Sequence, residues 1–82
     1  MAREVIWSGP TTCDFDGMKV GDRLVANWDH DCSTTIIDGS ARFASWSVMC
    51  PKCHAKFGIG LGVGKGQKYE RREDGAYVKV AG

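Results

Sequence analysis

Four cysteines and two histidines are the side chains of this 82-residue sequence whose types favour metal chemistry. Two of the cysteines form the run Cys50-Pro51-Lys52-Cys53. A pair with this spacing can hold one metal ion from a tight turn, and Pro51 restricts that turn. Lys52 adds a cation that favours the charged form of the neighbouring thiols. The run therefore predicts a structural Zn²⁺ site in which Cys50 and Cys53 are ligands.

A structural zinc site is tetrahedral and needs two further ligands. The first choice is the four-cysteine set of Cys13, Cys32, Cys50 and Cys53. His30 stands two residues before Cys32 and could replace either of the other two cysteines. Asp16 stands where a second Cys-x-x-Cys pair would be completed after Cys13, and a carboxylate can also bind zinc. The third and fourth ligands therefore stay open among these residues.

Other interpretations of the cysteines are weaker. A redox Cys-x-x-Cys pair belongs to a βαβ context, which this sequence lacks. Four unrelated buried thiols would not require the tight pair. Iron could bind the same four thiolates in place of zinc. His54 directly follows Cys53, so we expect it to lie beside the metal site or in solvent rather than on the ion.

Length and composition favour one small domain over residues 1–82, stabilised by the metal. Hydrophobic residues make up 43% and charged residues 26% of the chain, as in a folded globular protein. No apolar run approaches the ~18 residues of a membrane span, and the first residues lack a signal-peptide core. We therefore expect a cytoplasmic protein with no membrane partner, in which thiols stay reduced.

The hydropathy pattern predicts a mostly β domain with long loops. Asp38-Gly39 has the composition of a hairpin turn. Glycine occupies every second position from Gly58 to Gly66 and alternates with Ile59, Leu61 and Val63. This pattern predicts an extended strand with one bare face, covered by a tryptophan. A short helix is expected over residues 67–73, where helix formers cluster. The expected strands cover residues 4–7, 18–25, 34–37, 41–49, 56–63 and 76–80, and the strand at 18–25 is expected to run around a Gly-Asp turn.

Charge is distributed unevenly along the chain. Residues 1–49 contain four Lys/Arg and seven Asp/Glu (4 − 7 = −3), whereas residues 50–82 contain seven and three (7 − 3 = +4). A basic segment with glycines can meet an acidic partner or a nucleic-acid backbone. The candidate contact residues in this segment, 58–72, are Lys65, Lys68, Arg71 and Arg72.

From Ile37 onward the chain resembles a group of small zinc-ribbon-like proteins of bacteriophages and prophages, mostly without an assigned function. The similarity is carried by the pieces Asp38-Gly39, Trp46, Met49 to His54, Gly60 to Glu70 and Tyr77 to Val80, in that order. The resemblance implies a zinc ribbon with a first cysteine-bearing turn upstream, at Cys13 to Gly17. This sequence departs from the pattern at Asp16 and by an apparent insertion over residues 25–35.

These observations favour a zinc-binding interaction module that docks on a protein. The alternative is a zinc ribbon that binds nucleic acid through the basic residues. An enzyme is the least favoured class, because paired carboxylates beside a base are missing and no nucleophile other than cysteine stands out.

Overall fold

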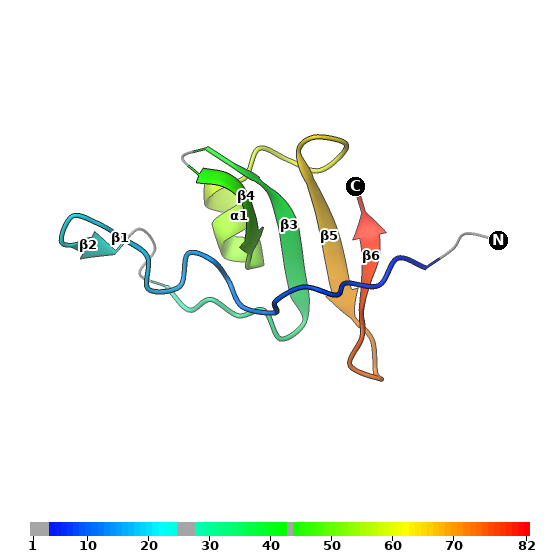
Figure 1. Ribbon diagram of the computed structural model, residues 1–82. Coiled ribbons are helices and arrows are strands. Elements are labelled where there is room, and N and C mark those ends of the chain that lie inside the picture. Colours follow the sequence, from blue (N-terminus) through cyan, green and yellow to red (C-terminus); the bar gives the residue numbers. More distant parts are fainter. Residues whose placement is uncertain (1–3, 25–27, 43) are drawn as a thin grey trace.

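The computed structural model describes residues 4–24, 28–42 and 44–82 (Figure 1). The described part is mostly β with one short helix, as the sequence predicts. The main sheet is antiparallel and has the strand order β4-β3-β5-β6. Its strands are β3 (Thr35–Ala41), β4 (Ala44–Met49), β5 (Gly66–Arg71) and β6 (Tyr77–Ala81). The helix α1 (Pro51–Phe57) follows β4 directly.

A separate small hairpin pairs β1 (Lys19–Val20) with β2 (Arg23–Leu24). Gly21-Asp22 forms its turn, and Gly21 takes a φ of +64°, which glycine adopts without the steric penalty of a Cβ. Figure 1 shows this hairpin projecting away from the sheet. The sequence predicts a strand around a Gly-Asp turn at residues 18–25, and the structure has this turn between two short strands. Val25 lies outside the described residues.

Both faces of β3 are covered. Ile36 pairs with Tyr69 of β5, and Ile37 pairs with Met49 of β4, so the two isoleucines point to opposite faces of the sheet. Trp7 of the N-terminal segment packs on the Tyr69 ring with centroids 5.2 Å apart. Figure 1 shows α1 behind β4 and the N-terminal segment running across the front of the strands. These two covers enclose the small core on which the metal-ligating candidates lie.

Asp38-Gly39, predicted as a hairpin turn, lies instead in the middle of β3. Gly39 pairs with Gly66, and a Cβ at Gly39 would lie 2.7 Å from the carbonyl O of Lys65. The Ser40 N–H donates to that same carbonyl at 2.8 Å. The absence of a side chain at Gly39 therefore allows the backbone of β3 to lie close to the backbone at Lys65 and Gly66.

The predicted strand at residues 4–7 is present only as an isolated bridge between Ile6 and Val78. The other differences concern residues 56–73. The helix is α1, formed within the predicted cysteine turn, whereas the predicted helix at 67–73 is largely strand β5, paired to both neighbours. The predicted strand at 56–63 is the end of α1 followed by a loop. In this loop Gly60, Gly62 and Gly64 all have positive φ. The predicted tryptophan cover is therefore wrong: among the described residues, no tryptophan lies within 4 Å of a Cβ built at Gly60, Gly62 or Gly64. The apolar residues between the glycines are exposed, by 47% for Ile59, 38% for Leu61 and 98% for Val63.

Candidate metal centre

The first two candidate ligands lie where β4 ends and α1 begins. Cys50 is the N-cap of α1, with extended backbone (φ −69°, ψ 160°), and Pro51 occupies the first turn. The Cys53 N–H donates to the Cys50 sulfur at 3.4 Å. Proline suits this position, since the first helical N–H groups lack intrahelical partners. The expected tight turn is thus the first turn of a helix, and it brings Cys50 and Cys53 together.

Cys13 is brought to the same place by a clamp on β4. The Asp14 N–H donates to the Val48 carbonyl at 2.8 Å, and the Val48 N–H donates to Asp14 Oδ2 at 2.8 Å. A turn follows, in which the Asp16 N–H donates to the Cys13 carbonyl at 3.1 Å. Asp14 is a functional residue that the sequence reading missed, because nothing in its spacing distinguishes it from the exposed Asp16.

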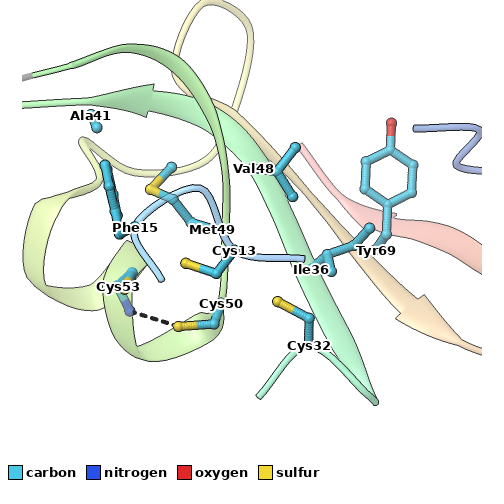
Figure 2. Close-up of a cluster of buried hydrophobic side chains, with 10 residues drawn as sticks. All are labelled: Cys13, Phe15, Cys32, Ile36, Ala41, Val48, Met49, Cys50, Cys53 and Tyr69. Atoms are coloured by element: carbon cyan, nitrogen blue, oxygen red, sulfur yellow. Dashed lines mark hydrogen bonds between the residues drawn. The ribbon is translucent and has the colours of Figure 1, made fainter. Parts of the chain in front are cut away.

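Phe15 anchors the turn that follows Cys13 in the core. Its side chain is fully buried, and its ring meets Phe57 of α1 edge-on with centroids 5.4 Å apart. Figure 2 shows Phe15 beside Cys53 and Met49 in the buried cluster. The aromatic residue at position 15 therefore ties the Cys13 turn to the helix that carries Cys53.

His30 completes the group. Its Nδ1 lies 3.2 Å from the Cys13 sulfur, 3.2 Å from the Cys53 sulfur and 3.6 Å from the Cys50 sulfur. The ligand atoms of Cys13, His30, Cys50 and Cys53 all lie within 4.8 Å of one another. With Zn–S bonds of about 2.3 Å and Zn–N bonds of about 2.0–2.1 Å, a tetrahedral site has N···S separations of about 3.5–3.6 Å. Three sulfurs and one nitrogen therefore form a group that could hold a metal ion.

Trp28 links His30 to the helix. Its ring stacks on Phe57 with centroids 5.9 Å apart and lies 6.2 Å from the His30 ring. Trp28 Nε1 is buried and has no hydrogen-bond partner within the part of the chain that the structure describes. Burial and the neighbouring thiols of Cys50 and Cys13 raise the pKa of Cys53, and the nearby Trp28 indole N–H acts against this rise. A thiolate at Cys53, as in a metal complex, would give this buried N–H a stronger acceptor, so the residues present fit a bound metal.

Cys32 and Asp16, also considered as ligands, lie outside this group. Asp16 is exposed in the turn after Cys13. Cys32 is buried, with 6% of its surface exposed, and its carbonyl accepts a hydrogen bond from Tyr77 Oη at 2.6 Å. Figure 2 shows its sulfur pointing toward the side of the cluster that holds Cys13 and Cys50. The geometry thus reverses the expected order of ligands, with His30 ahead of Cys32.

His54 and Lys52 lie close to the group without joining it. His54 Nε2 lies 3.0 Å from the Gly60 carbonyl, which ties the end of α1 to the glycine loop. Lys52 Nζ lies 5.7 Å from the centre of the Trp28 ring. A cation–π contact at this place keeps a positive charge near the thiols of the site.

Burial makes the free thiols poor acids. Burial is the largest cause that raises the pKa of Cys13 and of Cys53. The neighbouring thiols of Cys50 and Cys13 raise the pKa of Cys53 further, whereas backbone hydrogen bonds from Cys50 and Phe15 offset part of the rise at Cys13. Burial, followed by the charges of Cys13 and Cys50, raises the pKa of Cys32 to about 12. At neutral pH these thiols hold their protons, and a metal ion must displace them.

The basic candidates are partly neutralised. Lys68 Nζ lies 3.6 Å from Glu70 Oε1, and the Arg72 guanidinium pairs with Asp74 at 3.0 Å and with Glu4 at 2.5 Å. Lys65 and Arg71 are exposed, on the glycine loop and at the end of β5. The structure therefore spreads the four cations over β5 and its two flanking loops.

Comparison of the chain with protein-family models, with curated proteins and with solved structures gives no match. In the described ranges, no helix is long and apolar enough to cross a membrane.

Proposed function

We propose that this chain is a small zinc-binding interaction module without enzymatic activity, encoded by a bacteriophage or prophage, that docks on a protein in the cytoplasm of the bacterial host. One observation carries the proposal: the His30 nitrogen and the sulfurs of Cys13, Cys50 and Cys53 lie within 4.8 Å of one another. Sites with three thiolates and one imidazole are typical of structural zinc.

The donor set supports zinc over harder cations. Thiolate and imidazole are ligands that zinc prefers, whereas Mg²⁺ and Ca²⁺ take oxygen. Three thiolates and Zn²⁺ sum to a charge of −1, which Lys52 beside Trp28 helps to offset. Iron remains the rival metal for a thiolate-rich site, and the metal analysis described below distinguishes the two.

The closed donor set supports a structural role. Catalytic zinc keeps three protein ligands and an open position, whereas here four protein atoms surround one point. The four ligands come from the Cys13 turn, the His30 loop and the first turn of α1, which are distant in sequence. A bound ion would therefore connect segments that a domain this small holds together with few buried side chains.

The glycine loop at residues 58–65 supports a protein partner. It exposes Ile59, Leu61 and Val63, and exposed Lys56 and Lys65 stand at its two ends. Apolar residues with a charged border are typical of contact surfaces between proteins. A partner with an apolar depression bordered by acidic side chains would fit this loop.

The alternative function is nucleic-acid binding, and one sequence observation favours it. Residues 50–69 contain four lysines and no Asp or Glu. The pairing of Lys68 and Arg72 with acidic side chains weakens it. If the alternative holds, the affinity for single- or double-stranded DNA or RNA falls steeply with salt. Absence of binding at low salt excludes it.

Native mass spectrometry of protein purified without chelator tests the metal assignment. We expect one zinc ion per chain, which is lost in Cys53→Ala and retained in the matched control His54→Ala. Absence of metal, or iron in place of zinc, would contradict the assignment. For the partner, a photo-crosslinking residue at position 63 should give a discrete protein adduct in bacterial cells, whereas the same residue at exposed position 80 on β6 should not. Equal results at the two positions would contradict the docking role of the loop.

A further inference from the structure

Five side chains of the kinds that bind zinc lie around a site with four places. Four of them form the group of Cys13, His30, Cys50 and Cys53. The fifth, Cys32, stands two residues from His30 in the same segment. The Cys32 side chain is buried beside this group, which makes it a candidate for a further ligand.

The environment of Cys32 places it at the edge of the site. The side chain is buried, with 6% of its surface exposed, and it belongs to the same buried cluster as Cys13 and Cys50. Figure 2 shows the Cys32 sulfur directed toward the side of the cluster occupied by the Cys13 and Cys50 sulfurs. Its backbone is held by the hydrogen bond from Tyr77 Oη at 2.6 Å and, two residues on, by the bond from the Arg71 N–H to the Thr34 carbonyl at 2.8 Å.

Asp31, which stands between His30 and Cys32, makes its side-chain hydrogen bonds to a residue close by in the sequence. Asp31 Oδ1 accepts hydrogen bonds from the Ser33 N–H at 2.9 Å and from Ser33 Oγ at 2.6 Å, and both residues are exposed. A change in this turn therefore need not break its own hydrogen bonds. His30 and Cys32 stand on either side of Asp31, so both ligand candidates belong to this one short segment.

We propose that Cys32 is a reserve ligand, which takes the fourth place on the metal when His30 leaves it. This inference rests on the proposed metal-binding function. In the exchange, the metal–Nδ1 bond to His30 breaks, a metal–sulfur bond to Cys32 forms, and the Cys32 thiol proton passes to water. The oxidation state of the metal does not change. The site gains one negative charge and converts from three sulfurs and one nitrogen to four sulfurs.

The exchange has a chemical consequence for the choice of metal. Four thiolates favour softer ions than three thiolates with one imidazole. A chain that can use either set keeps its fold with more than one metal, or after loss of the His30 bond. The reserve ligand is thus a means of retaining the metal on which the fold depends.

Cobalt substitution tests the exchange, since visible spectra of Co²⁺ distinguish three-sulfur from four-sulfur coordination. We compare the wild-type chain with His30→Ala, Cys32→Ser and the double variant. Wild type and Cys32→Ser should give the same spectrum. His30→Ala should bind one Co²⁺ within about tenfold of the wild-type Kd, with a stronger sulfur-to-cobalt charge-transfer band. The double variant should bind at least about 100-fold more weakly than His30→Ala, because even loss of an outer-shell partner weakens metal binding by about 10–100-fold.

X-ray absorption at the zinc edge gives a second readout that does not depend on affinity. The zinc-loaded wild type should show three sulfur neighbours and one nitrogen neighbour, and zinc-loaded His30→Ala should show four sulfur neighbours. The double variant should show no more than three sulfur neighbours. The inference is overturned if His30→Ala binds cobalt as weakly as the double variant, or if its zinc has only three sulfur neighbours. If the wild type binds no metal, the proposed function itself fails and the inference falls with it.

Discussion

The Asp14 clamp gives the sharpest mutational test of how the site is assembled. Asp14 directly follows the candidate ligand Cys13 in the sequence, and its Oδ2 accepts a hydrogen bond from the Val48 N–H at 2.8 Å. Val48 is buried, with 8% of its surface exposed, so Asp14→Ala leaves its N–H without this acceptor. A buried donor without a partner costs about 1–3 kcal/mol.

Because Asp14 itself is exposed, water can reach part of this position after the substitution. We therefore expect the lower half of that range, about 1–2 kcal/mol, which corresponds to a change of about 5–30-fold in an equilibrium constant. The lost bond also frees the Cys13 turn, so the zinc affinity should fall by the same factor. Competition with a chelator measures the zinc affinity, and urea denaturation of the loaded protein measures the free energy of unfolding.

Asp16→Ala is the matched control, since Asp16 is an exposed aspartate in the same turn. Its effect should stay within about 0.5 kcal/mol. Equal effects of the two substitutions on zinc affinity would refute the argument that the Asp14–Val48 bonds position Cys13.

Three further predictions concern the metal, pH and the close approach of two strands. Removal of the metal should unfold the chain, because structural zinc contributes about 10–16 kcal/mol while a small domain has a total stability of about 5–15 kcal/mol. Circular dichroism should show that the folded signal returns with Zn²⁺ and not with Mg²⁺. An unchanged thermal transition after chelation would contradict this prediction. Cysteine thiols are mostly protonated at neutral pH in the metal-free chain, because their ordinary pKa is about 8.5. Burial raises the pKa of Cys13 and Cys53 further wherever the fold persists. Zinc binding should therefore release up to about three protons, and the zinc affinity should rise with pH. An affinity that does not change between about pH 6 and 8 would be inconsistent with thiol ligands. Gly39→Ala places a Cβ 2.7 Å from the carbonyl O of Lys65 and should destabilise the zinc-loaded protein by about 1–3 kcal/mol. In the same urea titration, the control Ser40→Ala should change the free energy of unfolding by no more than about 0.5 kcal/mol.

Local composition was sufficient to predict several strands. The β-branched run before Asp38 predicts the start of β3, and the alternation from residue 41 to 49 predicts β4. The last strand, expected at 76–80, is β6 at Tyr77–Ala81. In each case side chains that suit a pleated, partly buried surface coincide with strands of the sheet.

Glycine and proline misled the prediction where tertiary contacts set their role. Gly39 reads as a turn residue, yet it serves the close pairing of β3 with β5. Pro51 reads as part of a tight turn, yet it begins α1. Both residues suit several local conformations, and the choice depends on partners that are distant in sequence.

The candidate site was predictable only in part, because only some of its residues are close together in the sequence. The tight spacing of Cys50 and Cys53 needs no tertiary information, and Cys13 follows from residue type. The order of His30 and Cys32 could not be decided, because the two residues share one irregular loop without periodicity. The path of that loop is set by the stacking of Trp28 on Phe57 and by the bond from Tyr77 to the Cys32 carbonyl.

X-ray absorption at the zinc edge of the purified protein tests the central claim most directly. The account predicts one zinc per chain with three sulfur neighbours at about 2.3 Å and one nitrogen at about 2.0–2.1 Å. A spectrum with oxygen neighbours in place of sulfur, or a protein that holds no zinc, would contradict it.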